Sequence, residues 1–267
     1  MSAKEVMKDK AYTTEQIQQA LSTADHRMRM IILILVSTGC RIGALPGLTL
    51  GHLTKIPEYG LYKITFYEGT NNEYTFTTRE CARTGIDSYL LYRQRCGEKI
   101  LFNQNMNRWD PEDAPLIRLT FDAADSFQAS RQIRPIKYQS LKQILSLHLV
   151  RSGVRQEEHP PEHKKRVRKI VTLTNGFRKR CISLFIEAGL NHEIRELLVD
   201  HATGLDASYF RPSEKQVPEE YLKAEPYLTV DSSFRLAQEN QTLRVERSSW
   251  ESLREEVEGL KALLNKG

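Results

Sequence analysis

A short, densely apolar run near the N-terminus constrains the fold more than any other stretch. Residues 30–36 read MIILILV and lie inside a predicted helix from about Asp25 to Thr38. A helix that is apolar on most of its faces must be surrounded by other elements, so we expect it at the centre of the protein. The run is far shorter than the roughly 20 residues that span a bilayer, so it predicts a buried helix and no membrane anchor.

The elements around this helix predict a mainly α fold with a small antiparallel β-hairpin. Thr13 and Gln16 have the spacing of a capping box, which predicts a first helix that ends near Ser22. Alternating aromatic and β-branched residues predict two strands, at 61–67 and 73–78. The turn between them contains glycine and asparagine, which favours a hairpin.

Helix signals continue after the hairpin. Thr77 with Glu80 has the pattern of a second capping box, which predicts a helix to about Gly97. Residues 98–136 lack clear periodicity and contain three prolines, so we expect loops with one short element at about 119–124. Apolar spacing predicts further helices at 140–152, 191–198 and 215–228.

The C-terminal tail has a different pattern. A seven-residue repeat, typical of a coiled-coil seam, is formed by Leu236, Leu243, Trp250, Val257 and Leu264. The tail therefore favours a short coiled coil or packing on another subunit, with an amphipathic helix folded back on its own domain as the alternative. We divide the chain into a flexible arm (1–11), one large domain (12–230) and a C-terminal helix (231–267).

Charge and cysteine usage narrow the class of protein. The formal net charge is +5, which favours a polyanionic partner. The four cysteines have no C-x-x-C spacing, so we expect reduced core thiols and no zinc site. Basic residues are concentrated between Arg151 and Arg180. This concentration predicts either a solvated loop or a surface that binds phosphate groups. The candidate phosphate contacts are Lys164, Lys165, Arg166, Arg168, Lys169, Lys179 and Arg180.

Residues 175–212 carry the side chains best suited to chemistry. Arg178 opens a predicted helix, His201 follows a second helix, and Tyr209 lies a turn or two later. The guanidinium of arginine matches two phosphate oxygens at once. Histidine can transfer a proton near neutral pH, and a phenol can attack phosphorus when its anion is stabilised. Tyr221 and Tyr227 are alternative phenols, for which packing is the simpler interpretation.

A fourth residue lies far upstream. Arg41 follows the apolar run in STGCRIGALPGLTL, at the expected end of its helix. Together with Arg178, His201 and Tyr209 it resembles the active site of the tyrosine recombinase (phage integrase) family, with phrasing closest to archaeal members. The resemblance covers roughly residues 12–230. It implies the mainly α catalytic domain of that family, followed here by a C-terminal amphipathic helix.

The resemblance implies a site-specific DNA recombinase that uses no metal and no cofactor. Tyr209 would attack a phosphodiester of double-stranded DNA to form a 3′-phosphotyrosine and a free 5′ hydroxyl. Arg41 and Arg178 would bind the non-bridging oxygens, and His201 would hydrogen-bond the phosphate or transfer a proton. We expect a cytoplasmic, nucleoid-associated protein without a membrane partner. Assembly of several copies on DNA is left open.

Three positions depart from the family pattern. Asn175 stands where the H-x-x-R box has histidine, and we expect it to cap the helix of Arg178. By the resemblance it also belongs to the catalytic site, where it can donate one neutral hydrogen bond but cannot act as an acid or a base. Asn71 stands where the hairpin lysine is expected, and Ala44 replaces a glutamate. These losses predict a slow enzyme, or alternatively a catalytically inactive DNA-binding relative. A third hypothesis is a helical assembly protein that acts through its tail.

Overall fold

The apolar helix lies at the centre of the molecule, as predicted. The computed structural model describes residues 10–66, 74–155, 171–199 and 212–264. Helix α2 (His26–Thr38) begins after Asp25, whose carboxylate accepts a hydrogen bond from the Met28 amide at 2.7 Å. Every residue from Met30 to Val36 is buried. Gly39 ends the helix in the left-handed conformation, with φ 61°.

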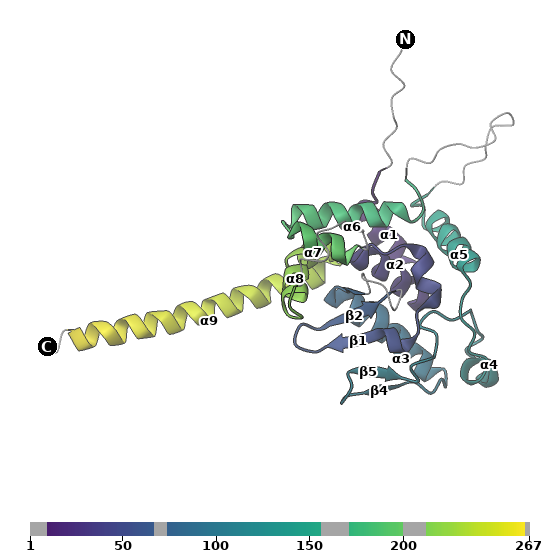
Figure 1. The fold of residues 1–267 in the computed structure, drawn as a ribbon, viewed down its shortest axis with the longest axis horizontal. Coiled ribbons are helices and arrows are strands. Elements are labelled where there is room, and N and C mark those ends of the chain that lie inside the picture. The colour runs from purple at the N-terminus through teal and green to yellow at the C-terminus, as the bar shows by residue number, and fades with distance from the viewer. Residues whose placement is uncertain (1–9, 67–73, 156–170, 200–211, 265–267) are drawn as a thin grey trace, which may run out of the picture.

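Helices from both halves of the chain surround α2 (Figure 1). Helix α1 (Thr14–Ser22) begins with the predicted capping box between Thr13 and Gln16, which is confirmed. The remaining partners are a π-helix, η3 (Cys81–Asp87), then α3 (Ser88–Arg95), α6 (Asn175–Glu187) and α8 (Gln216–Leu228). The central position of α2 thus brings the N-terminal and C-terminal parts of the large domain together.

An antiparallel five-stranded sheet flanks this helical core. Its order is β3-β2-β1-β5-β4. The bounds are β1 (Leu53–Ile56), β2 (Leu61–Thr65), β3 (Tyr74–Phe76), β4 (Leu101–Asn103) and β5 (Arg108–Asp110). The predicted hairpin is confirmed by the pairing of β2 with β3, in which Thr65 lies opposite Tyr74. Its turn, with Asn71, lies outside the described residues.

The prediction for residues 98–136 was correct for the mostly irregular chain but wrong for its short elements. This segment contains β4, β5 and the short helix α4 (Ser126–Ser130), whereas no element forms at 119–124. Strands of three residues are too short to show a period of two, and β5 is held by long-range pairing of Arg108 with Thr54 on β1. The Asp125 side chain caps α4 by accepting bonds from the amides of Phe127 and Gln128.

The second predicted capping box was also wrong. The Thr77 hydroxyl accepts a hydrogen bond from the Tyr62 amide across the hairpin, at 3.0 Å. The Glu80 carboxylate accepts bonds from the amides of Val230 and Asp231, at 2.7 and 3.2 Å. Both side chains therefore serve distant segments of the chain, which a local pattern cannot reveal. The helix after them is π-helical before it becomes α3.

A buried ion cluster joins α3 to the segment that follows the sheet. The Glu98 carboxylate is 3% exposed and accepts bonds from Arg93 and Arg118, which are 0% and 1% exposed. Arg93 Nε lies 3.0 Å from one Glu98 oxygen, and Arg118 Nη1 lies 2.5 Å from the same oxygen. Both guanidinium groups also donate to backbone carbonyls. The cluster fixes the irregular segment against the core.

The later helices follow the predicted order. Helix α5 (Tyr138–Arg151) buries Leu141, Leu145 and Leu149, and packs on the 3-10 helix η1 (Ile42–Gly47). A second short 3-10 helix, η2 (Leu50–His52), leads into the sheet. Helices α6, α7 (His192–Leu198) and α8 form a second apolar cluster with one face of β2 and β3.

Helix α9 (Ser232–Leu264) leaves the body of the molecule and projects away from it (Figure 1). The structure therefore differs from the alternative in which the tail folds back on its own domain. The proposed domain boundary at residue 230 stays a prediction, as does the flexible arm at 1–11. None of the helices in the described ranges is both long and apolar enough to span a membrane.

Candidate active site

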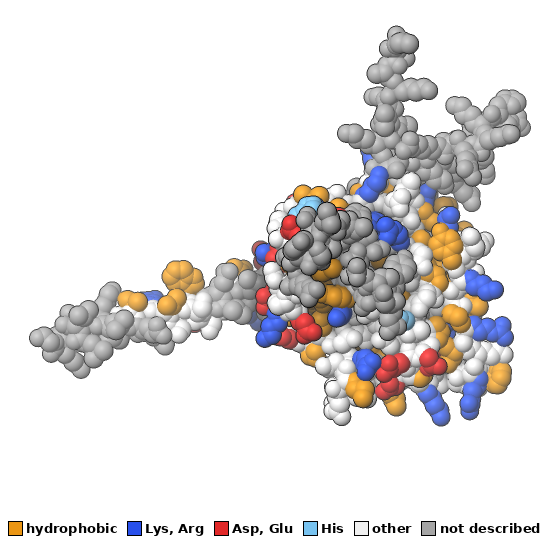
Figure 2. All heavy atoms as spheres, in the orientation of Figure 1, with side chains coloured by type: hydrophobic (Ala, Val, Ile, Leu, Met, Phe, Trp, Pro, Cys, Tyr) orange, Lys and Arg blue, Asp and Glu red, His pale blue; other side chains and the backbone are white. Residues whose placement is uncertain are grey.

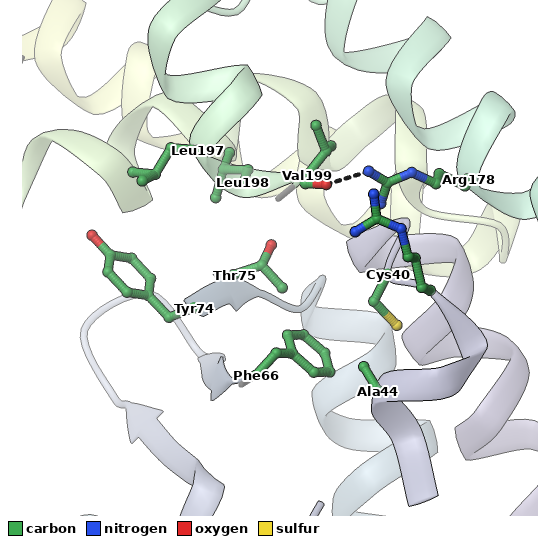
Figure 3. Close-up of a pocket in the computed structure, with 10 residues that line it drawn as sticks. Cys40, Ala44, Phe66, Tyr74, Thr75, Arg178, Leu197, Leu198 and Val199 are labelled. Carbon is green, nitrogen blue, oxygen red and sulfur yellow. Dashed lines mark hydrogen bonds between the residues drawn. The ribbon is translucent and has the colours of Figure 1, made fainter. Parts of the chain in front are cut away.

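One pocket gathers residues from four distant parts of the chain. It lies between the end of α2, the β2–β3 hairpin, α6 and α7 (Figure 3). Its lining residues are Cys40, Arg41, Ala44, Phe66, Tyr74, Thr75, Arg178, Leu197, Leu198 and Val199. The two arginines singled out in the sequence, Arg41 and Arg178, therefore line the same pocket.

Arg41 lies between two elements. The sequence had suggested that Arg41 ends a helix, and this prediction was wrong. Helix α2 stops at Thr38, and Arg41 has extended backbone angles, φ −71° and ψ 135°, just before η1. Its side chain is exposed at the pocket. Ala44 is buried in the same pocket, so the position where the family pattern has a glutamate offers no carboxylate here.

Arg178 lies in the first turn of α6 and is held by backbone carbonyls. Its Nη1 donates to the Gly39 carbonyl at 2.9 Å, and its Nη2 donates to the Val199 carbonyl (Figure 3). Gly39 is the C-cap of α2 and Val199 is the C-cap of α7. The carbonyl ends of two helices, which carry partial negative charge, therefore orient this guanidinium.

The close approach of α2 to α6 at this point requires glycine. A Cβ atom on Gly39 would lie 2.9 Å from the Cys181 Cβ and 3.8 Å from the Arg178 Cα. Its φ of 61° is also a conformation that other residues adopt at a cost. Gly39 thus lets the α2 carbonyl reach Arg178.

Burial disfavours the thiolate form of the thiol in the pocket. Burial raises the pKa of Cys40 to about 11, although the Thr38 hydroxyl and Arg178 act in the opposite direction. Burial likewise raises the pKa of Cys181, which packs beneath Gly39, to about 12. Both raised pKa values favour the protonated thiol near neutral pH. Cys181 is buried, as predicted for a core cysteine, whereas Cys40 is half-buried at the pocket.

The remaining predicted site residues on α6 have different environments. Asn175 is exposed and is the first residue of α6; Thr174 occupies the cap position, so the predicted Asn175 cap was wrong. Lys179 is half-buried. Arg180 is 6% exposed and donates to the Thr14 hydroxyl at 3.1 Å, and burial lowers its pKa. Arg180 therefore ties α6 to α1, and its burial argues against the predicted contact with DNA.

Several predicted site residues lie outside the described residues. They are His201, Tyr209, Lys164, Lys165, Arg166, Arg168 and Lys169. The alternative nucleophile Tyr221 is fully buried, and its hydroxyl donates to the Ser37 carbonyl at 2.9 Å. Packing explains Tyr221, whereas Tyr227 is exposed at the end of α8 and does not line the pocket.

Sequence reasoning missed the groups that position Arg178 and shape the pocket. The carbonyls of Gly39 and Val199 carry no side-chain signal, so no motif could have indicated them. Tyr74, on β3, and Phe66, directly after β2, were predicted as hairpin residues without a link to the site. Within the described ranges, no group of three or more His, Cys, Asp or Glu side chains could hold a metal ion.

The architecture matches a known fold. The structure is similar to that of XerA recombinase, with a TM-score of 0.50, 13% sequence identity and coverage of 83% of this chain. The mainly helical body with its small antiparallel sheet therefore has the fold of a tyrosine recombinase catalytic domain. This confirms the predicted fold class, whereas the archaeal detail stays a prediction.

A second similar structure is that of the XerH site-specific recombinase bound to difH substrate, with a TM-score of 0.45, 14% identity and coverage of 82% of this chain. The present chain covers 66% of the XerA chain and 55% of the XerH chain. No protein-family model and no curated protein matches the sequence.

Proposed function

We propose that this chain is an integrase-type DNA recombinase that cleaves and rejoins DNA through a 3′-phosphotyrosine. The observation that supports this best is that Arg41 and Arg178, which are far apart in the sequence, line the same pocket. Two guanidinium groups in one pocket suit a phosphodiester, because each can bind a non-bridging oxygen with paired N–H donors. The similarity of the fold to XerA recombinase agrees with this reading.

In the proposed reaction the phenol oxygen of Tyr209 attacks phosphorus as its proton is lost. The bond from phosphorus to the 5′ oxygen breaks, and that oxygen leaves as a hydroxyl after taking up a proton. Attack by a 5′ hydroxyl on the phosphotyrosine reverses the step, so the bond energy is conserved. Arg41 and Arg178 stabilise the charge that develops on the non-bridging oxygens. His201 hydrogen-bonds the same phosphate or transfers a proton.

The alternative is a DNA-binding relative that has lost the chemistry. Two observations favour it. Arg178 already donates to two backbone carbonyls, so it has a structural role that would preserve it without catalysis. The lysine and the histidine of the family pattern are replaced by Asn71 and Asn175. General acid–base groups of this kind typically contribute about 10²–10⁴-fold in rate, so their loss reduces the rate strongly.

A nicked, end-labelled DNA that traps the covalent intermediate tests the proposal. DNA from the genomic flanks of the coding sequence is the first choice of substrate. We expect a covalent protein–DNA band on a denaturing gel, and we expect Tyr209→Phe to abolish it. DNA binding that survives without any band would favour the inactive relative.

Tyr74→Phe is the matched control, because Tyr74 is a phenol that lines the pocket. This variant should retain the band. Loss of the band in Tyr74→Phe but not in Tyr209→Phe would show that the wrong tyrosine has been assigned. Arg41→Ala and Arg178→Ala should each reduce the band; an unchanged band in both would contradict the proposed phosphate site.

A further inference from the structure

Helix α9 carries an apolar stripe that no part of the described chain covers. Hydrophobic side chains lie on the surface of α9 (Figure 2). Trp250 is 73% exposed, and the other large apolar side chains of the stripe are also exposed. They are Leu236, Leu243, Leu253 and Val257. A tryptophan and four aliphatic side chains aligned on one helix mark an interaction surface, because soluble proteins rarely expose such a contiguous stripe.

The base of this helix is fixed to the body of the protein. The buried carboxylate of Glu80 accepts bonds from the amides of Val230 and Asp231, directly before α9. Gln18 Nε2 donates to the Val230 carbonyl at 2.8 Å. Thr229 is buried at the same junction. The junction therefore holds the start of α9 in one place, and the stripe projects beyond it.

The spacing of the stripe selects a helix as its partner. Leu236, Leu243, Trp250 and Val257 are seven residues apart, and a seven-residue apolar repeat keeps one seam facing another helix along a left-handed supercoil. Leu253 lies three residues after Trp250 and starts the second row of the seam. A helix of 33 residues is roughly 50 Å long, which is enough for a stable coiled coil.

We infer that the partner is α9 of a second copy of this chain, and that the two helices pair antiparallel about a point between Trp250 and Leu253. In this register Trp250 packs against Leu253 of the second copy, and each pair occurs twice by symmetry. This inference goes beyond the proposed function, because it concerns assembly of the chain without DNA.

The acidic residues of the seam select the antiparallel orientation. Glu239 and Glu246 occupy the row that Leu253 continues. In a parallel pair Glu239 would face Glu239 of the second copy, which places like charges together in the seam. In the antiparallel pair the two copies of Glu239 lie far apart along the coiled coil, so this repulsion is absent.

The shape of the molecule favours the same orientation. The body lies at the base of α9 and close to the line of its axis (Figure 1). A parallel pair would bring two bodies to one end of the coiled coil, where they compete for space. An antiparallel pair places them at opposite ends, separated by roughly the 50 Å length of the helix.

The mass of the full-length protein in solution, measured by sedimentation equilibrium without DNA, tests the pairing. We expect twice the 30.9 kDa of one chain. Trp250→Lys should give the single-chain mass with the body still folded. Ser248→Ala, an exposed position of α9 away from the seam, is the matched control and should stay dimeric. A single-chain mass for the unaltered protein at all concentrations, or a trimer, would overturn the inference.

A disulfide test of the orientation does not depend on the tryptophan. Leu236 is exposed near the base of α9. In the antiparallel pair the two copies of residue 236 lie roughly 45 Å apart, so Leu236→Cys should form no disulfide between copies under oxidising conditions. In a parallel pair the two cysteines would face each other and be linked. A linked dimer of Leu236→Cys that the unaltered protein does not form would overturn the antiparallel register.

Discussion

Replacing Gly39 by alanine tests whether the contact between α2 and α6 orients the arginine of the candidate site. Two costs add at this position. Alanine in a left-handed conformation costs about 1–2 kcal/mol. A Cβ placed 2.9 Å from the Cys181 Cβ adds the cost of overpacking, about 1–3 kcal/mol, because the neighbour is a buried helix and not a flexible side chain.

We therefore expect Gly39→Ala to lower the free energy of unfolding by about 2–5 kcal/mol, measured by urea denaturation followed by circular dichroism. Gly189→Ala is the matched control. Gly189 has a similar φ of 68°, but a Cβ there would meet nothing within 4 Å. The control should show only the conformational cost, and any effect of alanine on the unfolded chain is common to both variants.

The difference between the two variants thus isolates the steric contact. Equal losses of stability for Gly39→Ala and Gly189→Ala would refute the reasoning, since they would show that α6 is not in tight contact with Gly39. A shift of α2 would also move the Gly39 carbonyl away from Arg178. We expect the folded fraction of Gly39→Ala to bind DNA more weakly than the control variant does.

Three further predictions follow from the structure. Glu98→Gln leaves two buried arginines without their carboxylate and should cost about 3–5 kcal/mol in urea denaturation, whereas Glu112→Gln, in an exposed pair, should cost less than about 1 kcal/mol; similar values would contradict the role of the cluster. Cys40, whose pKa is raised to about 11, should be alkylated by iodoacetamide at pH 8 far more slowly in the native than in the unfolded protein, as mass spectrometry would show. Asn175→His should increase the rate of the covalent DNA adduct by up to about 10²-fold without loss of stability, because Asn175 is exposed; an unchanged rate would exclude it from the site.

The sequence alone predicted the helices and strands whose capping residues, apolar runs or turn residues are close together in the chain. The capping box at Thr13 and the dense apolar run were sufficient for α1 and for a central α2, because caps and burial act over a few residues. The same reasoning found the β2–β3 hairpin and the long C-terminal helix. The resemblance to a recombinase family, based on four residues, led to the correct fold class.

Tertiary structure alone decided the features whose partners are distant in sequence. Glu80 has the spacing of a capping residue, yet it binds the amides that precede α9, 150 residues away. Arg180 reads as part of a basic surface but is buried against α1, because the helix that carries it turns that face toward the core. The meeting of Arg41 with Arg178, and the carbonyls of Gly39 and Val199 that orient the latter, depend on how α2, α6 and α7 pack. Backbone acceptors and packing faces leave no residue-type pattern, so only the folded chain reveals them.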